Sequence, residues 1–263
     1  PLENSVSILG ASEFKVAITS DQDCGQIIVR LCDVSPSGSS KRISYGVLNL
    51  AMRNGLDCPK LVVAGEVMNV SIKLDDTGYQ LPAGHRLRLA VSSAYFPLIW
   101  PAPKKAKLTL DLASSCLTIP CHDRSATLVR DLGQGYVCPV KKTQKIRPEK
   151  HERLIQTDAK DGLVSTIIND DFGEFTFVEH NLTVGESCNE RHSILPDDPY
   201  SASSECRWHS HQSRPGWDIN IYTQLKVTCD GDYFYLNSNI EALENGVQIH
   251  QSQYQEKLPR GFS

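Results

Sequence analysis

The stretch "MNVSIKLDDTGYQLPAGHRLRLAVSSAYFPLIWP", residues 68–101, decides the fold class, because apolar and polar residues alternate along it. Alternate residues of a strand point to opposite faces of a sheet, so a period of two predicts a strand with one buried face. Residues 68–74 and 87–91 show this period, with Asp-Asp-Thr-Gly and Pro-Ala-Gly turns between them. The stretch therefore predicts short strands joined by tight polar turns.

The same pattern extends outward to both sides, and helical periodicity is nearly absent. Alternating apolar residues predict further strands around residues 14–18, 27–31 and 108–112. Short alternating strands at regular spacing are typical of an antiparallel sandwich, in which each sheet buries one face. Residues 1–119 are therefore predicted to form an antiparallel β-sandwich.

A second block of strands follows a stretch without clear alternation. Residues 120–150 hold charge clusters, two glycines and three prolines, and we predict a linker there. Residues 151–263 are predicted to form a second antiparallel β domain, a meander that curls to protect its edges. Its strongest strand is "WDINIYTQLKVTC", residues 217–229, and Asp-Gly and Asn-Gly turns at 230–231 and 245–246 predict hairpins after it.

Composition excludes several classes of function. The chain has 263 residues and a net charge of -4, and no run of Lys and Arg exceeds two residues, so we expect no nucleic-acid partner. Apolar runs are far shorter than the ~20 residues of a membrane span, and no signal-peptide pattern opens the chain. Because the first residue is Pro1 and a strand pattern starts almost at once, we expect a piece of a longer protein.

The cysteines indicate a compartment rather than a site. The nine cysteines are odd in number, irregularly spaced and without a C-x-x-C pair, which a zinc or redox site would normally show. Free thiols in a reducing cytoplasm are the simplest interpretation.

Catalytic motifs are missing from the sequence. A serine hydrolase of the α/β type needs G-x-S-x-G on a strand-to-helix elbow, and no such sequence occurs here; glycine-rich phosphate loops are absent as well. His85 follows a turn, and the sequence contains no serine or cysteine nucleophile motif for which it could act as a general base. We therefore interpret it as a residue that hydrogen-bonds a neighbouring loop. We therefore predict no catalytic residue and no cofactor in this chain.

Three clusters resemble metal sites without satisfying their requirements. In a strand His209 and His211 would share a face while Cys206 points away, and no fourth ligand is evident. We predict an exposed polar face there, with Trp208 on the opposite, core-facing side. The acidic pairs 197–198 and 75–76 lack the six or more oxygens of a calcium site and are interpreted as turns.

One aromatic segment remains as the candidate surface. Tyr95, Phe96 and Trp100 place three large rings within six residues, next to Pro97 and Pro101. They cannot all lie on the core face of one strand, so some of them are expected to cover a neighbouring domain or a ligand.

The two blocks resemble a known family. "VRLCDVSPSGSSKRISYGVLNLAMRNG" (29–55) and "IKLDDTGYQLPAGHRLRLAVSSAYFPLIWPAP" (72–103) are similar to the C-terminal jelly-roll domain of the bacterial cocaine esterase/NonD acyl hydrolases, relatives of the X-Pro dipeptidyl-peptidases. "SILPDDPYSASSECRW" (193–208), residues 217–246 and the terminal "LPRGF" resemble the extension carried by some members. The resemblance implies a galactose-binding-like jelly roll over 1–119.

The resemblance also implies a role and a partner. In that family an upstream α/β-hydrolase domain supplies Ser, Asp and His, so no catalytic residue carries over to this chain. The jelly roll packs on that domain and helps to wall its substrate cleft, and Tyr95, Phe96 and Trp100 are the expected contact. The uncovered surface would also favour a homodimer. The alternatives are a free-standing carbohydrate- or ligand-binding sandwich and, ranked last, a metal-dependent enzyme that uses the histidines.

Overall fold

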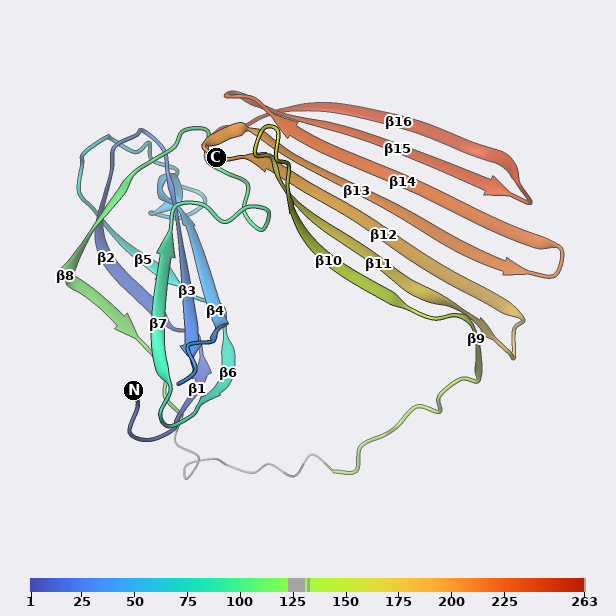
Figure 1. Ribbon diagram of the computed structural model, residues 1–263, viewed down its shortest axis with the longest axis horizontal. Helices are drawn as coiled ribbons and strands as arrows, with labels where there is room; N and C mark the ends of the chain where they lie inside the picture. Colours follow the sequence, from blue (N-terminus) through green and yellow to red (C-terminus); the bar gives the residue numbers. More distant parts are fainter. Residues whose placement is uncertain (123–130, 132, 263) are drawn as a thin grey trace. The chain divides into compact units, whose positions relative to one another are not determined.

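A computed structural model describes residues 1–122, 131 and 133–262. The chain divides into two compact units, Pro1–Gly133 with Phe262–Ser263, and Gln134–Gly261. Strands make up both units, and a short 3-10 helix at Leu50–Met52 interrupts the first (Figure 1). The all-β prediction is confirmed. No helix among the described residues has the length and apolar character needed to cross a membrane.

The first unit is an antiparallel sandwich of small sheets. Its strands are β1 (Val6–Gly10), β2 (Glu13–Ser20), β3 (Gln26–Val34), β4 (Ser40–Asn49), β5 (Met68–Lys73), β6 (Thr77–Leu81), β7 (Arg86–Ser92) and β8 (Leu108–Thr118). They form three-stranded sheets in the orders β5-β2-β8 and β4-β3-β7, and β1 pairs with β6. Every pairing within this unit is antiparallel.

Alternating apolar residues meet in the core of this sandwich. Ile27, Val29 and Leu31 of β3 are fully buried and face a layer from β2 and β5 that comprises Phe14, Val16, Ile18, Met68, Val70 and Ile72. Burying a side chain of this size stabilises a fold by about 1.5–3 kcal/mol, so this cluster is the main source of the unit's stability. The alternation that predicted these strands is thus confirmed.

The two sheets come close together at Gly46 of β4. A Cβ atom at this position would lie 2.5 Å from the backbone oxygen of Lys73 and 3.1 Å from the Cα of Leu74. Glycine is required here by the close approach of two backbones rather than by a turn.

One expected core position lies outside the core. Leu112 continues the alternation of Leu108 and Leu110, but it is 71% exposed. The register of β2 against β8 shifts, because Ala17 pairs with Asp111 whereas Lys15 pairs with Cys116. The extra residues of β8 bulge away from the partner strand and carry Leu112 with them.

The second unit is one long antiparallel sheet. Its strands are β9 (Thr143–Arg147), β10 (Lys150–Thr157), β11 (Val164–Phe177), β12 (Leu182–Leu195), β13 (Asp198–Arg214), β14 (Trp217–Cys229), β15 (Tyr233–Glu244) and β16 (Val247–Pro259). From β10 to β16 the order in the sheet follows the order in the chain, and β9 pairs with the end of β11 (Figure 1). This is the predicted meander.

The linker prediction for residues 120–150 is wrong at residues 143–147, which form β9. β9 and β10 both pair with β11, at its two ends, and Pro148 interrupts the edge between them. Proline cannot donate a hydrogen bond to a sheet, so it is tolerated at an edge. The mostly polar "TQKIR" is exposed, which is why it shows no apolar alternation.

Both predicted hairpin turns are present. Asp230 Oδ1 accepts hydrogen bonds from the backbone N–H groups of Asp232 and Tyr233, which closes the turn between β14 and β15. Asn245 and Gly246 have φ values of 50° and 77°, as a type I′ turn between β15 and β16 requires.

The second unit buries far fewer side chains than the first. Trp208 was expected in a core but is 40% exposed, and Leu225 on the adjacent strand is also 40% exposed. A sandwich covers one face of each sheet with another layer, whereas β10–β16 form a single sheet within their own unit. The alternation in this block therefore marks two chemically different faces rather than a packed interior.

Candidate functional site

The aromatic segment after β7 lies outside the sandwich core. Tyr95, Phe96 and Trp100 are half-buried, and none of them belongs to the buried cluster between the sheets. The backbone folds back on itself here, with Ile99 N–H donating to the Tyr95 carbonyl at 2.9 Å. The segment is thus a compact corner on the unit's surface.

Tyr95 is anchored to the outer face of the β4-β3-β7 sheet. Its hydroxyl oxygen accepts a hydrogen bond from Arg42 at 2.6 Å, and the guanidinium of Arg30 lies 4.9 Å from its ring centre. Tyr45 meets the ring edge-to-face at 6.4 Å. Cation–π and edge-to-face contacts of this kind contribute roughly 0.5–1.5 kcal/mol each, so they fix the ring in place.

The other two rings of the corner support each other. Phe96 and Trp100 pack edge-to-face with ring centres 5.8 Å apart. Gln26 Nε2 donates to the Trp100 carbonyl at 3.1 Å, which ties the end of the corner to β3. Leu98, between the two rings, is 51% exposed. The corner is therefore held by contacts from β3 and β4 and presents apolar surface outward.

His85 is part of a hydrogen-bonded network with Asp33 and Tyr79. Its Nδ1 lies 2.7 Å from Asp33 Oδ1, and the Tyr79 hydroxyl donates to Asp33 Oδ2 at 2.8 Å. Burial by itself raises the pKa of Asp33, but the hydrogen bonds from His85 and Tyr79 outweigh it and leave that pKa below its ordinary value. The same hydrogen bond raises the pKa of Tyr79.

A histidine with an aspartate at its Nδ1 supplies two of the three members of a hydrolase triad. The third member, a nucleophile, must meet the histidine's Nε2. Within the described part of the chain, no serine or cysteine hydroxyl or thiol is hydrogen-bonded to His85. Sequence inspection missed Asp33 because 52 residues separate it from His85. The network joins the end of β3 to the turn before β7.

His209 and His211 are separated from Cys206. His209 stacks on Tyr222 with ring centres 4.4 Å apart, and its Nε2 lies 2.8 Å from Asn220 Oδ1. His211 lies between the carboxylates of Glu174 and Asp218, at 3.2 and 3.0 Å. Cys206 points to the other face of the sheet, as the alternation along β13 requires.

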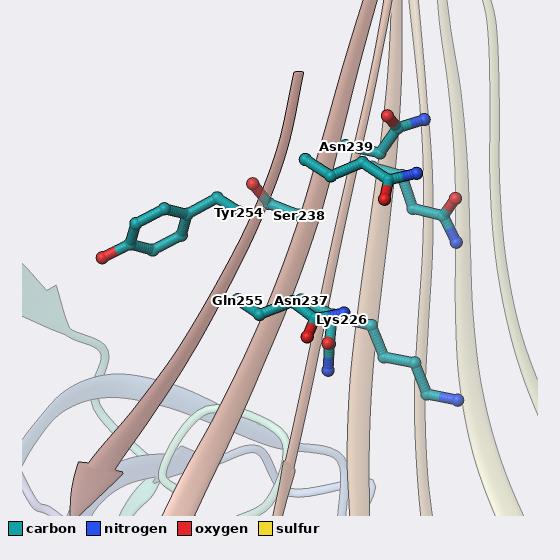
Figure 2. Close-up of a pocket in the computed structure, with 8 residues that line it drawn as sticks. Lys226, Asn237, Ser238, Asn239, Tyr254 and Gln255 are labelled. Atoms are coloured by element: carbon teal, nitrogen blue, oxygen red, sulfur yellow. The ribbon is translucent and has the colours of Figure 1, made fainter. Parts of the chain in front are cut away.

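The face that carries these histidines holds a pocket of about 230 Å³ near the sheet's last strands. Gln224, Asn239 and Gln253 lie directly opposite one another on β14, β15 and β16. The neighbouring row on the same face consists of Lys226, Asn237 and Gln255. Figure 2 shows Lys226 and Tyr254 projecting to opposite sides of the sheet. Amide side chains with paired donors and acceptors therefore form the wall of the pocket.

The amide row continues across the sheet. The row that contains Gln224 of β14 continues through β13, β12, β11 and β10. Its members there are Arg207, Asn189, Asn169 and Glu152, each directly opposite the next. Asn189 donates to Asn169 and Asn169 to Glu152, both at 2.9 Å. The signal in the sequence was the alternation Gln251, Gln253, Gln255, which places amides on one face of a strand.

The comparison with protein families gives a match over more than half of the chain. Residues 1–155 match the family described as the X-Pro dipeptidyl-peptidase C-terminal non-catalytic domain. The chain belongs to this family. The resemblance stated from the sequence is thus confirmed for the first unit and the beginning of the second.

Relatives within this family are much longer than the matched segment. The Xaa-Pro dipeptidyl-peptidase of Streptococcus pneumoniae is 34% identical over 106 residues, which is 40% of this chain and 14% of that protein. The matched segment thus spans about a seventh of the curated relative.

The similar solved structures cover less than half of the chain. An α-amino acid ester hydrolase has 19% identity and a TM-score of 0.44, with 46% of this chain and 24% of the other covered. A CocE/NonD family hydrolase from Staphylococcus aureus has 13% identity and a TM-score of 0.40, with 46% and 29% covered.

Proposed function

We propose that this chain is a non-catalytic C-terminal region of a serine hydrolase, an acyl esterase or X-Pro dipeptidyl-peptidase, that packs on its α/β-hydrolase domain. The observation that supports this most is the aromatic corner at residues 95–100. It is anchored by Arg30, Arg42 and Gln26 yet presents Leu98 outward, 51% exposed. The inner side of this corner is anchored to the sheet and its outer side is apolar, which suits a permanent contact with another domain. In this role it contributes one wall of the substrate cleft.

The first test is the coding sequence upstream of Pro1. A G-x-S-x-G within a few hundred residues upstream supports the proposal, because it is the elbow on which such a hydrolase carries its serine. An upstream region without this sequence, or one that encodes an unrelated domain, overturns it.

The second test uses the full polypeptide and a matched pair of variants. Leu98→Asp introduces a charge into the proposed contact, and we expect kcat/KM towards Ala-Pro anilides to fall about tenfold or more, because small displacements of a cleft wall cost rate. Leu112→Asp is the control, since Leu112 is 71% exposed on β8. Equal activity of both variants and the parent contradicts a contact at residues 95–100.

Self-association is the companion proposal for the chain without its hydrolase domain. Analytical ultracentrifugation of the isolated chain should then show a dimer that Leu98→Asp dissociates and Leu112→Asp does not. A monomer at all concentrations removes the homodimer.

A neutral-ligand site is the second candidate function, and the amide pocket favours it. Asn239 Oδ1 is buried at this pocket and has no hydrogen-bond partner among the described side chains and backbone. A buried acceptor without a partner costs about 1–3 kcal/mol, which a ligand hydroxyl would recover. Titration with neutral oligosaccharides should detect binding that Asn239→Ala weakens and Ser252→Ala, on the other face, does not. Absence of binding at millimolar concentration contradicts this candidate.

A further inference from the structure

Two thiols and a carboxylate meet on the second unit's other face, the one that carries Trp208. Glu190 of β12 lies directly opposite Cys206 of β13, and Cys188 is two residues before Glu190 on the same face. The Cys188 and Cys206 sulfur atoms are 3.6 Å apart, and Cys188 Sγ is 3.7 Å from Glu190 Oε1. All three ligand atoms lie within 4.8 Å of one another.

These separations suit one tetrahedral ion. With Zn–S bonds of about 2.3 Å and a Zn–O bond of about 2.1 Å, tetrahedral angles place two sulfurs about 3.8 Å apart and sulfur and oxygen about 3.6 Å apart. The observed 3.6 and 3.7 Å match this spacing closely. A disulfide needs about 2.05 Å between its sulfurs, so the two thiols are not bonded to each other.

The carboxylate of the cluster is oriented by a histidine. His192 Nε2 lies 3.0 Å from Glu190 Oε2, the oxygen that does not face Cys188, and His192 Nδ1 lies 2.7 Å from Ser204 Oγ. The His192 side chain is 15% exposed. Residues behind a metal ligand typically hold it in this way, and their loss costs about 10–100-fold in metal affinity.

A divalent cation would bind the two sulfur atoms of the cluster as thiolates. Burial, then the hydrogen bond and charge of Cys206, and then Glu190 raise the pKa of Cys188 to about 12. A divalent ion opposes this shift, because it binds thiolates and releases their protons as it does so.

We propose that Cys188, Cys206 and Glu190 bind one Zn²⁺ ion, with His192 positioning Glu190 and the fourth coordination position left to water. Thiolate ligands select Zn²⁺ over the hard cations Mg²⁺ and Ca²⁺. The ion would join β12 to β13 in the middle of a sheet that has little core of its own. This inference is independent of the function proposed above.

The test is a titration of the reduced chain with Co²⁺ as the spectroscopic probe. We expect one equivalent to give a sulfur-to-cobalt charge-transfer band and visible bands of tetrahedral intensity, and one equivalent of Zn²⁺ to abolish both. Affinity should fall as pH falls, because protons compete for the thiolates. Absence of the charge-transfer band, or a Cys188–Cys206 disulfide in the protein purified under reducing conditions, overturns the proposal.

Variants locate the site. Cys188→Ser and Cys206→Ser should each abolish the charge-transfer band or halve its intensity. His192→Ala should bind the metal ion about 10–100-fold more weakly. Cys58→Ser is the control, because Cys58 is an exposed thiol of the first unit, and it should bind like the parent. If Cys188→Ser fails to fold, thiol counting on the parent chain decides. Zn²⁺ should protect two of the nine thiols from a thiol reagent, and equal reactivity with and without Zn²⁺ contradicts the site.

Discussion

The imidazole Nδ1 of His85 lies 2.7 Å from Oδ1 of Asp33, a carboxylate that is only 6% exposed. Tyr79 donates to the second oxygen of the same carboxylate. Each oxygen of Asp33 thus has a partner, as a buried carboxylate requires. The network ties the start of β7 to β3 and to β6.

Stability of the first unit should depend on this carboxylate at acid pH. The pKa of Asp33 is lowered in the folded chain, so its contribution is present above the unfolded pKa of about 3.9 and is lost as pH falls through the lower folded value. Denaturant unfolding at a series of pH values should show this loss.

Asp33→Asn should flatten that pH dependence and lower the free energy of unfolding at pH 7 by about 1–3 kcal/mol, because it disturbs hydrogen bonds of a buried group. Asp76→Asn is the control, since Asp76 is exposed in a turn. If both variants unfold alike at pH 7 and at pH 3, the network contributes nothing to stability.

Gly46→Ala should destabilise the sandwich by about 1–3 kcal/mol, since overpacking between two backbones cannot be relieved by rotating a side chain. The added Cβ would lie 2.5 Å from the Lys73 carbonyl oxygen. Gly135→Ala is the matched control, because nothing lies within 4 Å of a Cβ there. Thermal unfolding of both variants measures the difference, and an unchanged midpoint for Gly46→Ala would show that the sheets can separate freely.

The isolated chain should turn over neither p-nitrophenyl esters nor Ala-Pro anilides, because His85 has no hydrogen-bonded nucleophile among the described residues. Steady-state assays on repurified protein measure this. Activity that survives repurification and disappears in His85→Ala would instead make the Asp33–His85 pair catalytic.

Arg153→Met should raise the pKa of Asp170, which Arg153 and then His151 hold at about 2. Arg153 meets the carboxylate with two N–H groups at 2.7 and 2.9 Å, and His151 remains in the variant, so the rise should stop short of the ordinary value. Carbon-13 NMR of the aspartate carboxyls follows the titration. Lys150→Met, on the opposite face of β10, should leave it unchanged, and an unshifted Asp170 in Arg153→Met contradicts the ion pair.

The candidate sites could be predicted from the sequence only where their residues are neighbours in the chain. Tyr95, Phe96 and Trp100 stood out because three large rings fall within six residues, beside two prolines. Cys188 and Cys206 did not, since 18 residues separate them and only the register of β12 against β13 brings the sulfurs together. Register depends on pairing along the whole of both strands, which no short motif reports.

Trp208 shows a second limit of prediction from the sequence. Period-two alternation assigned it to the face opposite His209 and His211, and that assignment is right, but its place in a core was wrong because it is 40% exposed. A period of two reports that a strand has two faces. It contains no information on whether a second layer covers one of them.

The sequence by itself determined the all-β class, the hairpin turns at Asp230 and Asn245–Gly246, and the family of the first unit, because each depends on local periodicity, turn chemistry or a continuous match. Only the tertiary structure decided that Asp33 holds His85, that β14–β16 line up their amides, and that two cysteines face one carboxylate. These depend on contacts between residues far apart in the chain, and such contacts are set by strand register and layer packing.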